Sequence, residues 1–112
     1  MSKIKDLDIK VRDILKNDEK SRNSDIRLMQ LIWWKYYPQF VTEIDGKYYI
    51  DINNLYDLPR EDNIKRIRAK IQNEEKLYLP TDAIVASKRG WKEDEWRSYL
   101  GKSIAGIDNQ YL

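Results

Sequence analysis

The sequence contains no cysteine and no histidine among its 112 residues. Without cysteine there are no disulfides and no thiolate chemistry, and without histidine the chain lacks the usual general base and the imidazole ligand of common zinc sites. A catalytic site would have to be built from carboxylates, lysine or tyrosine. We therefore expect a protein that is not an enzyme and that binds no metal ion or other cofactor.

Long hydrophobic runs are also missing. A helix that crosses a bilayer needs about 18 or more consecutive apolar residues, and no such run occurs in the chain. The N-terminus carries Lys3, Lys5 and Asp6, whereas a signal peptide has an apolar stretch there. These absences predict a soluble, cytoplasmic protein that does not enter a membrane.

Charges of both signs are plentiful but nearly balanced. Lysine and arginine number 21 and aspartate and glutamate 19, so the formal net charge is only +2. Any attraction for a polyanion must therefore come from local clusters of cations. Four tryptophans and eight tyrosines supply enough aromatic area to stabilise one core, and the length fits a single domain.

Hydrophobic spacing predicts a mostly α protein with a small β-hairpin, an α+β fold. Asp45-Gly46 is a pair well suited to the two-residue turn of that hairpin. A helix stop at Gly101 separates a domain over residues 1–100 from a C-terminal tail over 101–112. The expected elements are helices over 3–16, 25–37, 52–58, 60–73, 82–88 and 91–100, a hairpin of 41–44 with 47–50, and a short edge strand over 77–79.

Capping residues and apolar stripes give the details of these helices. In the helix over 25–37, Ile26, Met29, Trp33 and Tyr36 recur at helical spacing and predict its core face, and Pro38 ends it. Gly90 fits the position just after the helix over 82–88. The expected N-caps are Ser2, Asn23 or Ser24, Asp51 or Asn53, and Thr81.

The helix over 60–73 is basic and amphipathic, and it follows Leu58-Pro59. Ile64, Ile67 and Ile71 form a narrow apolar stripe, because each helical residue advances by about 100°. From Ile64 to Asn73 there are four cations and no anion. A packed helix that offers cations on its outer face is typical of a nucleic-acid contact.

We therefore expect this helix to bind double-stranded DNA through phosphates and base edges. The small Ala69 would let a groove wall approach closely, and a second basic cluster follows the helix over 82–88. The candidate DNA-binding residues are Arg60, Lys65, Arg66, Arg68, Ala69, Lys70, Asn73, Lys88 and Arg89.

The order of segments, from the aromatic helix over 25–37 through Leu58-Pro59 and the basic helix to Leu79-Pro80-Thr81, resembles the small winged-helix proteins of bacteriophages and prophages. The resemblance spans roughly residues 25–100 and implies a winged helix-turn-helix fold. It also implies noncatalytic binding of duplex DNA by the third helix, in a regulatory or phage-related role inside a bacterial host or virus-infected cell. Such proteins often form homodimers, but no heptad repeat or evident self-complementary strand marks a dimer surface.

Two other functions compete with DNA binding. The first is a phage-type adaptor or inhibitor that binds a host or phage protein through the aromatic surface of the helix over 25–37 and through Trp91, Trp96 and Tyr99. The second is a metal-dependent nuclease, because Glu43, Asp45, Lys47 and Asp51 loosely resemble the carboxylates and lysine of such enzymes. Asp45-Gly46 is more simply a hairpin turn.

Overall fold

The computed structural model describes residues 3–110 and places the side chains of residues 6–101. The chain is mostly helical with one two-stranded antiparallel hairpin, as the sequence predicts. The expected N-cap Ser2 and the last two residues lie outside the described residues. The helices are α1 (Lys3–Asn17), α2 (Asp25–Tyr36), α3 (Glu61–Asn73), α4 (Ala83–Lys88) and α5 (Glu93–Gln110), the 3-10 helices are η1 (Glu19–Asn23), η2 (Pro38–Phe40) and η3 (Ile52–Asp57), and the strands are β1 (Val41–Ile44) and β2 (Lys47–Ile50).

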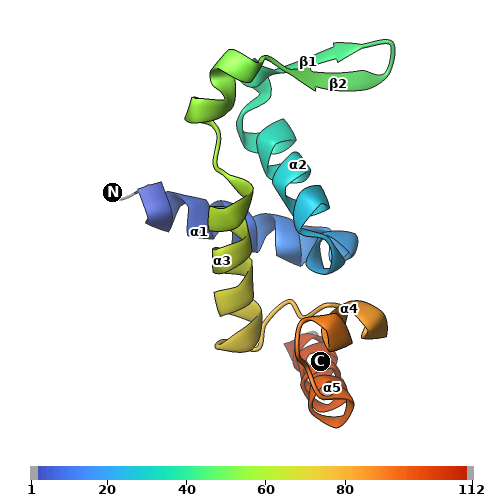
Figure 1. Ribbon diagram of the computed structural model, residues 1–112. Helices are drawn as coiled ribbons and strands as arrows, with labels where there is room; N and C mark the ends of the chain where they lie inside the picture. Colours follow the sequence, from blue (N-terminus) through green and yellow to red (C-terminus); the bar gives the residue numbers. More distant parts are fainter. Residues whose placement is uncertain (1–2, 111–112) are drawn as a thin grey trace.

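Helices α1, α2 and α3 form the main core, and α1 crosses the other two (Figure 1). Each contributes one apolar face, so the three helices bury side chains that none could bury alone. The hairpin lies at one end of this three-helix unit, and α4 and α5 lie at the other (Figure 1). The buried core residues are Leu7, Val11, Ile14, Leu15, Leu28, Ile32, Ile64 and Ile71.

The core face of α2 differs from the predicted stripe. Leu28 and Ile32 are fully buried, whereas Met29 and Trp33 are only partly buried and Ile26 is 56% exposed. The apolar residues of this helix cover most of its circumference, so spacing alone did not decide which of them face inward. The N-cap prediction is confirmed, because the Ser24 side chain accepts a hydrogen bond from the Arg27 backbone N–H.

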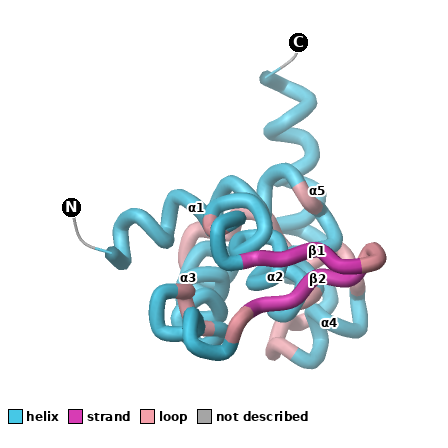
Figure 2. Tube along the Cα trace, turned by 90° about the horizontal axis from the view of Figure 1, so that it is seen from above, coloured by secondary structure: helices cyan, strands magenta, loops and turns pink. Residues whose placement is uncertain are grey.

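The hairpin has the predicted strands and turn. β1 and β2 pair with Val41 opposite Ile50 and Ile44 opposite Lys47, and the two turn residues Asp45 and Gly46 have φ of 51° and 77°. Positive φ at both central residues is the geometry that favours an Asp-Gly pair. Figure 2 shows the two strands side by side, and no third strand of the described chain joins them. Asp51 then caps η3 by accepting a hydrogen bond from the Asn53 N–H.

The predicted strand over 77–79 does not form. Lys76 and Tyr78 have φ of 58° and 49°, which breaks extended geometry, and the segment is an irregular connection. Its conformation is fixed by tertiary contacts, because the buried Gln72 side chain donates a 2.7 Å hydrogen bond to the Tyr78 carbonyl. Leu79 then enters a second small core with Ala86 and Trp96.

Two predicted helix boundaries in the C-terminal part are wrong. The N-cap of α4 is Asp82 and not Thr81, because the Asp82 carboxylate accepts from the N–H groups of Ile84 and Val85. Helix α5 continues past Gly101 to Gln110. A glycine inside a helix costs only about 1 kcal/mol relative to alanine, so it does not stop a helix by itself. Gly90, with φ of 89°, does end α4 as predicted.

A polar network joins the two cores. The Asn23 side chain accepts hydrogen bonds from the Thr81 and Asp82 N–H groups and donates one to the Thr81 hydroxyl. Arg68 of α3 donates two 2.9 Å hydrogen bonds to the two carboxylate oxygens of Asp25 in the first turn of α2. Arg89 adds a second cation, 3.8 Å from the same carboxylate. Bidentate, charge-assisted pairs of this kind are the strong ones.

Asp25 should make stability depend on pH. Burial favours the neutral carboxyl, but Arg68 outweighs it and holds the pKa of Asp25 below its usual value. The stabilisation is therefore complete above the unfolded pKa of about 3.9 and is lost as the pH falls through the folded pKa. We expect Asp25→Asn to lower the free energy of unfolding by about 2–4 kcal/mol at neutral pH, since Arg68 loses its counter-ion. Urea unfolding across the acidic and neutral range measures this difference, which should shrink below about pH 4.

Asp45→Asn is the matched control, because it makes the same chemical change at an exposed turn residue and asparagine tolerates positive φ. Its stability should stay within about 0.5 kcal/mol of the wild type. Equal stability of the Asp25→Asn and Asp45→Asn variants at neutral pH would contradict the role given to Asp25.

Candidate nucleic-acid interface

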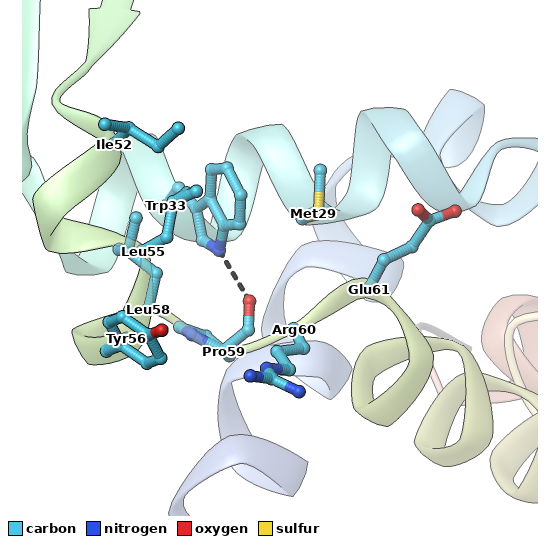
Figure 3. A pocket seen from close by; sticks show the side chains of 9 residues that line it. All are labelled: Met29, Trp33, Ile52, Leu55, Tyr56, Leu58, Pro59, Arg60 and Glu61. Carbon is cyan, nitrogen blue, oxygen red and sulfur yellow. Dashed lines mark hydrogen bonds between the residues drawn. The ribbon is translucent and has the colours of Figure 1, made fainter.

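A tryptophan of α2 fixes the start of α3. The Trp33 indole N–H donates a 2.9 Å hydrogen bond to the carbonyl of Pro59, as the dashed line in Figure 3 shows. Leu58, just before this proline, is buried. The corner between η3 and α3 is therefore held both by apolar packing and by a hydrogen bond. Arg60 and Glu61 leave this corner in different directions (Figure 3).

The inner face of α3 is the one predicted from the isoleucine stripe. Ile64 and Ile71 are fully buried, and Ile67 is partly buried against the same core. The opposite face therefore points outward, and the side chains of Lys65, Arg66 and Lys70 are exposed. Asn73 is exposed and Ala69 is half-buried.

Exposed cations of α3 differ from most arginines of the chain, because they form no ion pair or hydrogen bond with a carboxylate within the described side chains. Arg12, Arg27 and Arg97 each form an ion pair with an acidic residue. Within the described side chains, no ion pair or hydrogen bond engages the charged groups of Arg60, Lys65, Arg66 or Lys70. These four cations remain available to an external anion.

Arg68 does not belong to this surface. It is 4% exposed and its guanidinium is bound to Asp25 and to the Gln72 amide oxygen. Its position explains this, because residue 68 is four residues after Ile64 and three before Ile71 and so lies on the buried face. The prediction that Arg68 contacts DNA is not compatible with this placement.

The second predicted basic cluster is also divided. Lys88 is exposed, but Arg89 points into the protein. The Arg89 guanidinium donates a 2.6 Å hydrogen bond to the Arg22 carbonyl and a 3.2 Å one to the Gln72 amide oxygen. Arg89 therefore links the two cores by hydrogen bonds, and its guanidinium is not free to bind a ligand.

A groove of about 700 Å³ runs beside the first half of α3 and brings in residues that the sequence did not single out. Arg60, Asn63 and Arg66 line it from α3 and its N-cap, and Lys10 lines it from α1. Lys10 is bonded to Asp6 at 2.8 Å and to the Tyr37 hydroxyl at 2.9 Å. Asn63 is three residues before Arg66, so helical spacing was a usable signal for it; Lys10 gave no comparable signal.

Acidic side chains near α3 limit where an anion can bind. Glu61 and Asp62 are exposed in its first turn, where they complement the positive end of the helix. Beyond the C-terminus, Glu75 is engaged by Arg12 at 2.8 Å, and this pairing holds the pKa of Glu75 below its usual value. Lys65 and Arg66 each lie four residues after one of the first-turn acids, and Lys70 interacts electrostatically with Glu75. The cations of α3 therefore form no ion pair within the described side chains but lie near acids at both ends of the helix.

The hairpin carboxylates do not assemble into a metal site. Glu43, Asp45 and Asp51 are exposed, and the described part of the chain holds no group of three or more acidic residues close enough to bind a metal ion.

Aromatic residues divide between core and surface. Trp96 is buried and donates a 2.7 Å hydrogen bond to the Pro80 carbonyl, and Trp91 and Tyr99 pack beside it. Trp34 of α2 is 56% exposed and lies edge-on to Tyr48 of β2, with ring centroids 6.3 Å apart. Together they border a groove of about 660 Å³ between α2 and the hairpin.

Comparison with known proteins gives no relatives. No protein-family model matches the chain, and no curated protein or solved structure is significantly similar to it. Within the described residues, no helix combines the length and apolarity that crossing a bilayer requires.

Arg66 and Arg68 provide a direct test of this description of α3. We expect Arg66→Ala to leave the free energy of unfolding within about 0.5 kcal/mol of the wild type, because the side chain is exposed and unpaired. Arg68→Ala should cost about 3 kcal/mol, because it leaves the Asp25 carboxylate without its bidentate partner. Urea unfolding monitored by tryptophan fluorescence compares the two. Similar losses for both variants would contradict the assignment of inner and outer faces.

Proposed function

We propose that the protein binds double-stranded DNA without cleaving it and that the outer face of α3 makes the contact. The observation that carries this proposal is the set of four exposed cations, Arg60, Lys65, Arg66 and Lys70, none of which forms an ion pair or hydrogen bond within the described side chains. The chain has 19 acidic residues against 21 basic ones, a net charge of only +2, so it holds enough carboxylates to pair with these four cations. Their clustering on the outer face of one helix favours an external polyanion.

The proposed contact has two components. Lys65, Arg66 and Lys70 bind phosphates or guanine edges, and Asn73 reaches an adenine edge or the backbone. The groove beside α3 extends this surface through Arg60 and Asn63. Because Glu61 and Asp62 repel phosphate at the helix N-terminus, the contact is centred on the middle of α3.

A helix-turn-helix arrangement is part of this proposal. The short η3, the Leu58-Pro59 corner and α3 follow one another as such a unit requires. In a winged helix the wing follows the third helix, but residues 74–80 contain no strand here. The hairpin β1–β2 precedes α3, so it would have to replace the wing. A regulatory or phage-related role follows from the same resemblance.

The alternative is an adaptor or inhibitor that binds a host or phage protein through its aromatic surface. Exposed Trp34 beside Tyr48 at an apolar groove is the observation in its favour, because exposed aromatic patches often mark interfaces. The C-terminal aromatics Trp91, Trp96 and Tyr99 pack against one another in the second core, so this surface is smaller than the sequence predicts.

Fluorescence anisotropy with a labelled duplex tests the DNA proposal. Four phosphate contacts predict that the logarithm of affinity falls with the logarithm of salt concentration with a slope of about −3.6, at −0.9 per contact. Arg66→Glu should weaken binding by roughly tenfold and reduce the slope to about −2.7. Adding magnesium should leave the duplex uncut.

Lys92→Glu is the matched control, because Lys92 is exposed just before α5 and the charge change is identical. It should retain the wild-type slope. No binding at low salt, or equal effects of the two variants, would overturn the proposal. Capture of a host protein that is lost in Trp34→Ala would then support the adaptor.

A further inference from the structure

The hairpin exposes three large hydrophobic side chains on only eight strand residues. Ile44, Tyr48 and Tyr49 are each at least 50% exposed, and they project from both faces of the two strands. The turn end of the hairpin projects beyond α2 (Figure 1), whereas Tyr48 lies against Trp34 of that helix. An isolated two-stranded hairpin is marginally stable in water and gains stability from further strands.

The outer edge of β2 has free backbone groups. In a hairpin with a two-residue turn, Ile44 and Lys47 form a hydrogen-bonded pair, and such pairs alternate along the strands. With the observed register, the N–H and C=O groups of Tyr48 and Ile50 point away from β1. Within the described chain, no hydrogen bond engages these four backbone groups. An edge of this kind is a template for another strand.

The sequence along this edge, Lys47-Tyr48-Tyr49-Ile50-Asp51, is complementary to itself in one antiparallel register. When two copies are centred on Tyr49, Tyr48 of one lies opposite Ile50 of the other, and their free backbone groups form hydrogen-bonded pairs. Lys47 then lies opposite Asp51 of the other copy, twice by symmetry. Lys47, Tyr49 and Asp51 are all exposed, and no ion pair engages Lys47 within the described side chains. Asp51 follows β2 directly and accepts one hydrogen bond from the Asn53 N–H as the N-cap of η3, and its exposed carboxylate faces solvent.

We propose that two copies of this chain dimerise by pairing their β2 edges antiparallel about Tyr49, which creates a four-stranded sheet. The dimer interface contains a pair of Tyr49 side chains at the two-fold axis, two Tyr48–Ile50 pairs and two Lys47–Asp51 ion pairs. Each of these classes of cross-strand pair is stabilising. An interface formed by the same patch on both subunits is the usual basis of a symmetric dimer.

The β1 edge lacks this complementarity. Its outward-pointing residues are Val41 and Glu43. Pairing β1 with a second copy places Glu43 opposite either Val41 or another Glu43, and neither arrangement satisfies its charge. Shifting the β2 register by two residues removes the match between Lys47 and Asp51. Charge therefore selects one edge and one register.

Sedimentation equilibrium of the full-length protein without DNA tests the proposal. The wild type should be dimeric. Lys47→Asp should raise the dimer dissociation constant by on the order of thirtyfold, because two attractive cross-strand pairs become repulsive ones. Asp51→Lys should do the same by placing two pairs of lysines opposite each other. A monomeric wild type overturns the proposal whether or not the protein binds DNA.

Mixing the two variants distinguishes cross-strand pairing from damage to the fold. In a heterodimer of the Lys47→Asp and Asp51→Lys chains, the unchanged Asp51 of the first chain faces the unchanged Lys47 of the second. The two substituted positions form the other opposite-charge pair, with reversed polarity. The mixture should therefore dimerise with nearly wild-type affinity although each variant alone does not. Lys92→Asp is the control for charge change and should remain dimeric. A mixture that stays monomeric, or a Lys47→Asp variant that dimerises like the wild type, overturns the proposal.

Discussion

The ion pair between Arg68 and Asp25 holds inward the same face of α3 that Ile64 and Ile71 bury in the core. It connects residues 43 positions apart, and the Arg68 side chain is almost completely buried. At about 100° per residue, Arg66 lies about 200° around the helix from Arg68. Holding Arg68 inward therefore turns Arg66 outward. The same network, through Gln72 and Arg89, fixes the C-terminal core against α3, so the cationic surface and the fold depend on one cluster of charges.

Elements defined by local chemistry were predictable. Asp45-Gly46 requires a tight turn, Ser24 and Asp51 cap the helices that follow them, and three isoleucines orient α3. What the sequence did not reveal were partners distant along the chain. Arg68 shares a face with Ile64 and Ile71, which was a usable sign of burial, but nothing local indicated that Asp25 would neutralise it. In the same way, Arg89 was predicted to bind DNA with Lys88, and nothing local indicated that it would bind the Arg22 carbonyl and Gln72.

Tertiary contacts also overrode local preference. Leu77-Tyr78-Leu79 has strand-forming side chains, yet Tyr78 adopts a positive φ and its carbonyl is bound by Gln72. This segment connects the two cores over a few residues. Its backbone conformation is therefore set by the contacts at both ends and not by its own strand propensity. The self-complementary edge of β2 could not be recognised either until the register showed which backbone groups point outward, because complementarity depends on that alternation.

DNA binding by α3 and dimerisation through β2 are linked by the number of phosphate contacts that one subunit can make. Four unpaired cations on a domain with a net charge of +2 give a single subunit a small number of phosphate contacts and modest affinity for DNA. A two-fold axis through Tyr49 would relate two α3 helices and double that number. Subunits related in this way recognise half-sites that are themselves related by two-fold symmetry. Trp33 would then have a second role, because its bond to Pro59 fixes α3 relative to the end of the molecule that carries the hairpin.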